Sequence, residues 1–579
     1  MKKVYFISLL LISYLNGYSQ QWSGNTTPTY PELISHLQKL DKQYKEIQLF
    51  NMGPSDYGLP IYLCVINGAR DSLKTFEKAK TQTTILINNA IHAGEPDGVN
   101  ACLLWLEQWV RAGKPTKSRN GKDDFPVIAF IPAYNVGGMM NRSSKSRANQ
   151  NGPEAYGFRG SAKNLDLNRD FIKMDASNSF IFARIFHALD PDVFIDNHVS
   201  NGADYPYTLT YISSLKERMA PSMRVLTYDS CIPILTDYCQ IGNFELFPYV
   251  ELKGETPESG IIAFNDLPRY AMGYASLFHS LSFTVETHML KPFPERVKAT
   301  LSFMNSIISY TIGHSQEIET ARNAAKNWVK NQSVYAYNYQ LNEKQVDQIR
   351  FKGYQAIYPE HPITGLKQLA YDQSQRYEKY IPYFNSYVAH DSVVIPKYYI
   401  VSGQEQAIIE RLESNQVDFT RITTSSTKTI EVSSFIVKDF KAPAKPYEGH
   451  FKLHDLKIEK QTIKLALKPG DILIPCQQDK ANFIHAVLQP LAEDSYLTWN
   501  FFDSYLQQKE YFSAYVFKDQ IAEILEAQPK LKEAYEQRKQ LDVKFANDEW
   551  AQLYFIYQNS PYFEPSYMRL PVYELHHVF

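Results

Sequence analysis

Five short apolar runs in the first half of the chain constrain its fold more than any other feature. None of them alternates strictly between apolar and polar residues, as is typical of strands that are covered on both faces. Segments with helical periodicity lie between the runs. The order of elements therefore predicts an α/β domain with a largely parallel or mixed sheet. The runs are Ile61–Ile66, Ile85–Ile87, Val127–Ile131, Val193–Ile195 and Phe283–Val285, and the helical segments include Val99–Val110 and Asn178–Leu189.

A length of 579 residues exceeds that of one ordinary domain and indicates two to four. The α/β pattern fades after a helix predicted over Leu301–Trp328, and a strand at Tyr398–Val401 marks its return. We expect a catalytic domain at 21–315, an irregular connecting region at 316–390 and an accessory α+β region at 391–579. The last hundred residues are predicted to be mostly helical, with the charged run Lys530–Lys544 on a solvated face.

The first 20 residues have the pattern of a secretory signal peptide. Lys2 and Lys3 precede the apolar run Val4–Leu15, and small residues at Gly17 and Ser19 offer a cleavage site. The apolar run is shorter than the ~20 residues that span a bilayer. We expect a periplasmic or secreted product without a transmembrane segment after cleavage.

Charge and cysteine content exclude two further classes of protein. The net charge is −2 and no basic block could follow a phosphate backbone, so nucleic acid is not an expected partner. Five cysteines, an odd number, argue against a disulfide framework. Cys231 and Cys239 could still form a bridge, and spacing alone leaves this open. The oligomeric state is not predicted.

The stretch from Ile91 to Pro96 lies between the predicted strand Ile85–Ile87 and a helix that begins near Gly98. It contains His92 and Glu95, whose imidazole and carboxylate groups are both zinc ligands. A catalytic zinc usually takes three protein ligands and leaves a fourth position to water. The stretch therefore suggests a zinc site, although an ordinary surface loop would fit this short pattern equally well.

Two further strand ends supply the groups that such a site lacks. His198 closes the run Val193–Ile195 and is a candidate third ligand; alternatively it is a structural hydrogen-bonding residue. Glu286 follows Phe283–Val285 and is a candidate general base, which a zinc hydrolase needs to move the proton of its water. A glutamate at a solvated strand end is the alternative.

The segment Asn164–Asp170 contains an amide beside a guanidinium, Asn168 and Arg169. Because arginine presents a rigid fork of donors, this pair is suited to binding a carboxylate. By itself the segment could equally be a charged turn.

Taken in chain order, these motifs resemble the zinc carboxypeptidases of the carboxypeptidase A type, over roughly residues 30–315. The resemblance implies an α/β/α sandwich around a mixed, mainly eight-stranded sheet. It also implies one zinc ion per chain, bound by three residues. The motifs are His92-x-x-Glu95, Asp166-x-Asn168-Arg169, His198 and Glu286.

The resemblance assigns a role to each of these residues. His92, Glu95 and His198 would hold the zinc ion, and Glu286 would be the general base. Asn168 and Arg169 would bind the C-terminal carboxylate of the substrate. Asp166 would hydrogen-bond the first zinc histidine and thereby fix its tautomer and ring direction.

The sequence departs from the family pattern in two places. The family has another arginine that polarises the scissile carbonyl, and Arg142, Arg147 and Arg159 all lie in the appropriate stretch. We favour Arg159, with Arg147 as the second choice. The family's mobile tyrosine has no clear counterpart either, since Tyr270 and Tyr274 are candidates that could equally pack in the core.

The sequence thus predicts a secreted or periplasmic zinc metallopeptidase that removes C-terminal residues from peptides. The alternatives are a zinc amidohydrolase that deacylates N-acyl amino acids and an inactive peptide-binding protein. Arg269, if it reaches the substrate pocket, favours acidic side chains, including those of cell-wall peptides. Alternatively, Arg269 pairs with Asp266 or another acid and never contacts the substrate.

Overall fold

The computed structural model describes residues 24–113, 125–426 and 428–577. The predicted signal peptide at 1–20 lies outside this range. Among the helices that the structure does describe, none is both long enough and apolar enough to cross a membrane.

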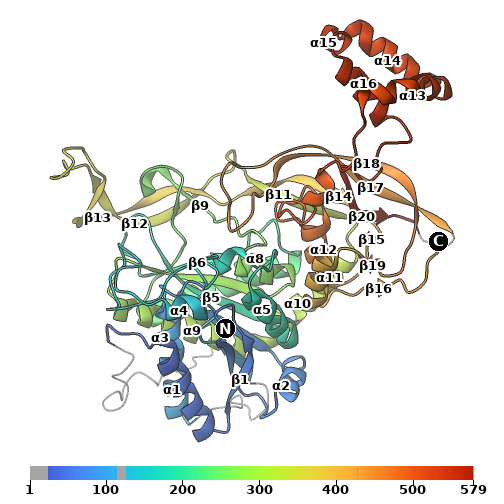
Figure 1. Ribbon diagram of the computed structural model, residues 1–579. Helices are drawn as coiled ribbons and strands as arrows, with labels where there is room; N and C mark the ends of the chain where they lie inside the picture. The colour runs from blue at the N-terminus through green and yellow to red at the C-terminus, as the bar shows by residue number, and fades with distance from the viewer. Residues whose placement is uncertain (1–23, 114–124, 427, 578–579) are drawn as a thin grey trace.

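A mixed eight-stranded sheet forms the centre of the first half of the chain (Figure 1). Parallel pairing joins β4, β3, β5 and β10, whereas antiparallel pairing adds β1 and β2 on one side and β6 on the other. The predicted fold class is confirmed, and the three central strands β3, β4 and β5 are buried along their whole length. The order of strands is β1 (Ile47–Pro54), β2 (Pro60–Ile66), β4 (Val127–Ile131), β3 (Thr84–Asn89), β5 (Val193–Ser200), β10 (Leu281–His288), β6 (Leu209–Ser213) and β7 (Leu246–Pro248).

Helices cover both faces of this sheet (Figure 1). On one face α3 (Asp97–Arg111) packs against α9 (Phe293–Gly313), and on the other α5 (Ser177–Leu189) and α8 (Ala271–Leu277) contact the central strands. The other helices of this half are α1 (Tyr30–Gln43), α2 (Ser72–Ala79), α4 (Val136–Met140), α6 (Pro221–Val225), α7 (Ile232–Ile241) and α10 (Ser315–Lys330), with short helical turns at Leu167–Arg169, Leu226–Cys231 and Pro257–Ser259.

Two helices replace the single one predicted over Leu301–Trp328. The break falls at His314, which follows Gly313 and leaves the helical region with φ −128° and ψ 22°. Glycine favours helix poorly because it loses more backbone freedom than other residues.

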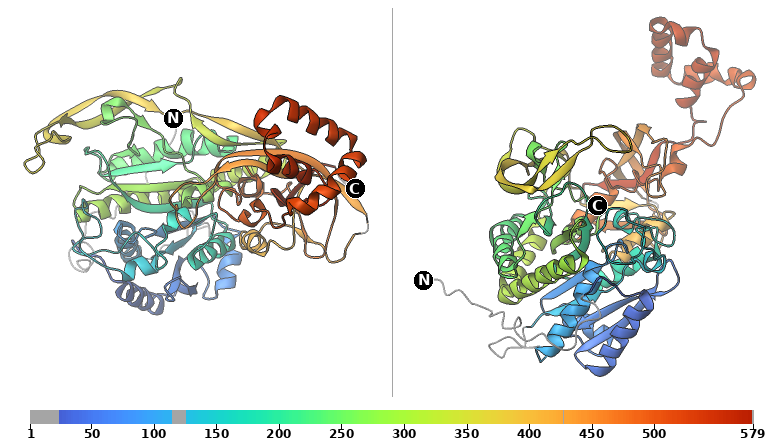
Figure 2. Two further views of the ribbon diagram at one scale, coloured as in Figure 1. Left: turned by 45° about the horizontal axis from the view of Figure 1, so that its top comes forward. Right: turned by 90° about the vertical axis from the view of Figure 1, so that its left-hand side faces the viewer.

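The region expected to be irregular, 316–390, instead forms the helix α10 followed by long antiparallel strands. They are β11 (Val334–Leu341), β12 (Asp347–Ile357), β13 (Ala370–Phe384) and β14 (Tyr387–Val394). The hairpin of β12 and β13 projects from the molecule and joins β8 (Glu251–Leu252) and β9 (Ile261–Ile262) in a four-stranded sheet (Figure 2). The prediction failed because few residues of these strands are buried, so the strands lack long apolar runs.

The C-terminal region is built on a six-stranded antiparallel sheet. Its strands, in order, are β16 (Thr420–Arg421), β19 (Ile472–Pro475), β15 (Tyr398–Val401), β20 (Arg569–Leu575), β17 (Thr429–Lys441) and β18 (His454–Ala466). Helices α11 (Gln406–Ser414) and α12 (Ala481–Leu488) and a helical turn at Asp503–Leu506 belong to the same region.

Four further helices form a lobe that stands away from the other elements (Figures 1 and 2). They are α13 (Ala514–Ala527), α14 (Pro529–Leu541), α15 (Val543–Ala546) and α16 (Glu549–Gln558). Phe517, Ile524 and Ile556 belong to a small separate core of this lobe. Most of the charged run Lys530–Lys544 is exposed, as predicted.

The C-terminal region is attached to the first half by a shared core and by buried polar contacts. One hydrophobic cluster runs from Leu33 through the eight-stranded sheet to Trp499 and Val572. At the boundary, Arg411 Nε donates to the carbonyl oxygen of Lys173 at 2.6 Å, and the Tyr274 hydroxyl group donates to Asn415 Oδ1 at 2.5 Å.

The cysteines are all buried and free. The Cys231–Cys239 bridge that the sequence left open is not formed. Cys239 Sγ instead donates to Ser306 Oγ at 3.5 Å.

One ion-pair network at this boundary should make stability depend on pH. Asp175 accepts hydrogen bonds from Lys173 at 2.8 Å and from His450 at 2.7 Å. Burial alone would raise the pKa of Asp175, but His450 and Lys173 lower it from 3.8 to about 2. A lowered pKa stabilises the fold above the unfolded value, and this contribution is lost as the pH falls through the folded value.

We therefore expect Asp175→Asn to lower the free energy of unfolding at pH 6 by about 2 kcal/mol. The difference from the wild type should shrink as the pH falls from about 4 towards 2, as measured by urea unfolding at several pH values. Asp439→Asn removes an exposed pair with Lys457 and serves as a matched control with little effect. A loss that is the same at pH 6 and pH 3 would contradict the linkage.

Candidate metal centre

The loop that contains His92 and Glu95 is fixed at both ends. Strand β3 ends at Asn89, Ala90 adopts a left-handed φ of 57°, and α3 begins at Asp97. Asp97 is buried and accepts a hydrogen bond from Arg296 Nε at 2.9 Å and one from Thr287 Oγ1 at 3.0 Å. Because α9 and β10 supply these two donors, the start of α3 cannot shift without breaking a buried ion pair.

Strands β5 and β10 bring the other two predicted groups together. They pair in parallel with His198 directly opposite Glu286, so both side chains project from the same face of the sheet. β5 extends to Ser200, which places His198 within the strand and not after it.

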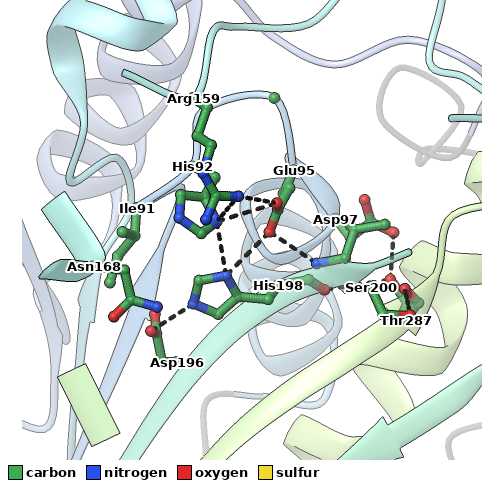
Figure 3. A network of polar contacts seen from close by, with 12 residues as sticks. Ile91, His92, Glu95, Asp97, Arg159, Asn168, Asp196, His198, Ser200 and Thr287 are labelled. Atoms are coloured by element: carbon green, nitrogen blue, oxygen red, sulfur yellow. Dashed lines mark hydrogen bonds and ion pairs between the residues drawn. The ribbon is translucent and has the colours of Figure 1, made fainter. Parts of the chain in front are cut away.

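His92, Glu95 and His198 converge on one point (Figure 3). His92 Nδ1 lies 3.1 Å from Glu95 Oε1 and 3.2 Å from His198 Nδ1. His198 Nδ1 lies 3.0 Å from Glu95 Oε2. The three residues are 3–4% exposed, so water does not separate their charges.

This arrangement fits a zinc ion. Ligand bonds of about 2.0–2.1 Å in a tetrahedral site place ligand atoms about 3.3 Å apart, close to the separations found here. The outer ring nitrogens face carboxylates: His92 Nε2 lies 3.0 Å from Asp166 Oδ1, and His198 Nε2 lies 2.6 Å from Asp196 Oδ2. If these nitrogens donate, both Nδ1 atoms present lone pairs to each other and to Glu95, an arrangement that a cation stabilises.

Asp196 is a supporting residue that the sequence interpretation did not assign. It lies two residues before His198 on the same strand, and the period of two places both side chains on one face. This spacing of two residues is the sequence signal that could have identified Asp196. Glu95 is supported separately, because Oε2 accepts from the Val199 backbone N–H at 2.9 Å and Oε1 from Arg147 Nη1 at 2.5 Å.

The site also shifts the pKa values of the surrounding carboxyl groups. Burial alone would raise the pKa of Asp166, but the charges of His92, Arg159 and Arg169 hold it well below its usual range. Burial raises the pKa of Glu286 to about 8, against the opposing charge of His198. A bound dication would lower that value, because a metal is the largest local charge in its site.

A cavity of about 460 Å³ opens beside the three ligands. Every residue that the sequence assigned to zinc, proton transfer or substrate lines it, apart from Asp166, which lies behind His92. The lining also includes Tyr249 and Phe264, which the sequence did not single out. The lining residues include His92, Glu95, Arg147, Arg159, Asn168, Arg169, His198, Tyr249, Phe264, Asp266, Tyr270 and Glu286.

Asn168 and Arg169 have free donors in this cavity. Asn168 Oδ1 accepts from the Ala271 backbone N–H at 2.9 Å, which turns its amide nitrogen away from that contact. Arg169 donates through Nη1 to the Asn168 carbonyl oxygen and stacks on the Tyr270 ring, 4.5 Å from its centroid. Within the described ranges, Asn168 Nδ2 and Arg169 Nη2 make no hydrogen bond.

Only one of the two candidate tyrosines lines the cavity, and one of the three candidate arginines lies outside it. Tyr270 lines the cavity, whereas Tyr274 is 1% exposed and bonded to Asn415 in the core. Arg142 lies outside the cavity lining and donates to the carbonyl oxygen of Thr27 at 2.7 Å.

Of the two alternatives for Arg269, the structure supports the one in which it pairs with another acid and does not reach the substrate pocket. Arg269 does not line the cavity and pairs with two acids of the C-terminal region, Glu493 at 2.9 Å and Asp494 at 2.9 Å. Its partner is therefore not Asp266. Asp266 lines the cavity itself and accepts hydrogen bonds from Ser214 and from the Leu215 backbone N–H.

Comparison with known proteins agrees with this geometry. Residues 33–211 match the family model described as zinc carboxypeptidase. The predicted resemblance is confirmed. So are the enzyme class, a zinc metallocarboxypeptidase hydrolase, and the zinc cofactor. His92, Glu95 and His198 form a group that could hold a metal ion. The match ends before Glu286, so the role of Glu286 depends on its position beside His198.

Solved structures of carboxypeptidases are also similar to this chain. A metallo-carboxypeptidase from Burkholderia cenocepacia shares 17% identity over 48% of this chain and 68% of its own, with a TM-score of 0.35. Carboxypeptidase A from Helicoverpa armigera shares 14% identity over 52% of this chain and 75% of its own, with a TM-score of 0.37. The comparison with curated proteins finds no match.

Substitutions around the site should change zinc binding in a graded way. We expect His198→Ala to lose stoichiometric zinc, because it removes one of three ligands. Asp196→Asn should weaken zinc binding by about 10–100-fold, as is usual for an outer partner of a ligand histidine. Competition with a chromophoric chelator measures both. A His198→Ala protein that keeps one tightly bound zinc ion would contradict the assigned site.

Proposed function

We propose that this protein is an exopeptidase that removes the C-terminal residue from peptides at the zinc site described above. One observation supports it above all: the ligand group, Glu286 and the free donors of Asn168 and Arg169 line one cavity. A catalytically inactive peptide-binding protein would need neither a complete set of metal ligands nor a general base. The expected signal peptide supports action in the periplasm or outside the cell.

In this proposal each residue has a separate task. Zinc held by His92, Glu95 and His198 would supply Lewis-acid chemistry and lower the pKa of a bound water. Glu286 would take a proton from the attacking water and return it to the leaving amine. Asn168 and Arg169 would bind the terminal carboxylate and so position the last peptide bond.

Side-chain exposure and hydrogen bonding support different roles for the two candidate arginines. Arg147 has a side chain that is 13% exposed, and it is engaged with Glu95 and with the carbonyl oxygen of Val199. Arg159 has a side chain that is 44% exposed; its Nε and Nη2 donate to Asp166 Oδ2 at 3.0 and 2.8 Å, and its Nη1 lies 3.7 Å from Glu95 Oε1. We assign the stabilisation of the developing oxyanion to Arg159 and the support of Glu95 to Arg147.

A peptide digest tests the function. Peptides with a free C-terminal carboxylate should be shortened by one residue, and the same peptides with an amidated end should be cleaved at least tenfold more slowly. The reason is that Arg169 would lose a charge-assisted partner worth about 1.5–3 kcal/mol. Mass spectrometry of the products measures this.

Glu286→Gln provides the matched control, since it should retain zinc and lose nearly all turnover. Equal cleavage of both peptide forms would instead indicate an endopeptidase. Release of the acyl group from N-acyl amino acids, with no peptide cleavage, would indicate the deacylase.

The position of Arg269 leads to a prediction about specificity. Arg269→Ala should leave the order of preference among peptides ending in Glu, Leu and Lys unchanged, because Arg269 lies outside the cavity lining. It should lower stability by about 3–5 kcal/mol, because it leaves the buried Asp494 without its ion-pair partner. Peptide assays and thermal unfolding separate the two effects, and a changed preference would restore Arg269 to the substrate site.

A further inference from the structure

A tight turn of the C-terminal region reaches the loop that supports the zinc ligands. The turn comprises Tyr447 to His450, in the connection between β17 and β18. Its two ends exchange backbone hydrogen bonds, from Tyr447 N–H to the His450 carbonyl oxygen at 2.7 Å and in return at 3.1 Å. The central residues Glu448 and Gly449 have φ values of 49° and 83°. Two successive left-handed residues define a type I′ turn.

Glutamate is an unusual residue for its place in this turn. The first central position of a type I′ turn favours asparagine, aspartate or glycine, because they tolerate a positive φ. Glu448 therefore adopts a conformation that costs energy for its residue type. Such backbone strain persists where the surrounding structure requires it. Here the requirement is the contact that the Glu448 side chain makes.

The side chain of Glu448 crosses to the loop of the metal site. The backbone N–H of Asp166 donates to Glu448 Oε2 at 2.7 Å. Asp166 is 8% exposed, so its backbone donor is largely shielded from water and needs a protein acceptor. Asp166 Oδ1 in turn lies 3.0 Å from His92 Nε2. A chain of hydrogen bonds thus runs from the C-terminal region to the zinc ligand.

The turn that carries Glu448 is itself held in place. His450 Nε2 lies 2.7 Å from Asp175 Oδ2, and the Tyr447 ring stacks on that of Trp499 with centroids 6.0 Å apart. Trp499 is fully buried. The carboxylate therefore projects from a rigid platform, as an orienting residue requires.

We propose that Glu448 is a positioning residue of the metal site, supplied by the C-terminal region and acting through Asp166 on His92. By fixing the backbone of Asp166, it holds the Asp166 carboxylate in the direction that orients the His92 ring. The C-terminal region is then part of the catalytic unit, and not an appendage with a separate task. This inference rests on the proposed function, because it requires a zinc ion at His92.

Two variants of the full-length protein separate this role from a purely structural one. Glu448→Asn tolerates the left-handed backbone but is one methylene shorter, so it withdraws the acceptor from the Asp166 N–H while relieving the strain. Glu448→Gln keeps the length and one carbonyl oxygen that can accept the bond. The measurements are thermal unfolding of the metal-free protein, zinc affinity by chelator competition, and kcat and KM for a peptide substrate.

We expect metal-free Glu448→Asn to unfold within a few degrees of the wild-type temperature, because relief of the strained φ offsets part of the cost of the lost hydrogen bond. It should bind zinc about three- to tenfold more weakly and show a lower kcat with little change in KM, a smaller effect than that of a direct ligand partner because it acts one bond further out. Glu448→Gln should remain within about twofold of the wild type on each measure, because it preserves the hydrogen bond.

Two results would overturn the proposal. One is a Glu448→Asn protein with the zinc affinity and kcat of the wild type, and the other is an equal loss in both variants, which would assign the effect to the charge of Glu448. A wild-type protein that binds no zinc would refute the proposed function together with this inference. A zinc-loaded wild type indistinguishable from Glu448→Asn would refute only the inference.

Discussion

The structure depends on holding three electron-rich groups within about 3 Å of each other in a buried place. Two imidazole lone pairs and a carboxylate that face one point repel one another unless a cation or a proton compensates them, and burial increases the repulsion because the local dielectric is low. Contacts with the surrounding elements hold the three side chains in place despite this repulsion. The pairing of β5 with β10 fixes His198, the Asp97–Arg296 ion pair fixes the start of α3, and Asp166 and Asp196 fix the outer ring nitrogens. The site is preorganised for a metal by its neighbours.

The same physics organises the boundary with the C-terminal region. A charge taken out of water is costly unless a partner compensates it. Arg269 with Asp494 is such a pair across the boundary, with side chains that are at most 8% exposed. It favours one docking arrangement, because a displacement would leave a buried charge without its partner. The boundary therefore fixes the position of the C-terminal region as well as stabilising the fold. This fixed position is why Glu448, although distant in sequence, lies beside Asp166.

The strands that carry continuous apolar runs could be predicted from the sequence. The prediction failed for strands that are not covered on both faces. The five central strands were found because both faces are covered. In contrast, β12 and β13 were missed because few of their residues are buried, so polar residues interrupt the apolar runs. The ligands and Glu286 were identifiable because each lies at or near the end of an apolar strand. Asp196 was within reach through its spacing from His198, but no local pattern relates Arg269 to Asp494 or Glu448 to Asp166, since more than 200 residues separate each pair.

The strand order of the C-terminal sheet has a consequence for how the protein is made. β20, residues Arg569–Leu575, lies between β15 and β17, so the last strand in the chain occupies an interior position. The sheet therefore stays open until synthesis has passed residue 575, and the connection that holds Glu448 gains its final support only then. A chain cut before residue 569 would contain every zinc ligand and still lack the closed sheet behind its positioning residue. The strand that completes this sheet therefore also completes the support of the connection that holds Glu448.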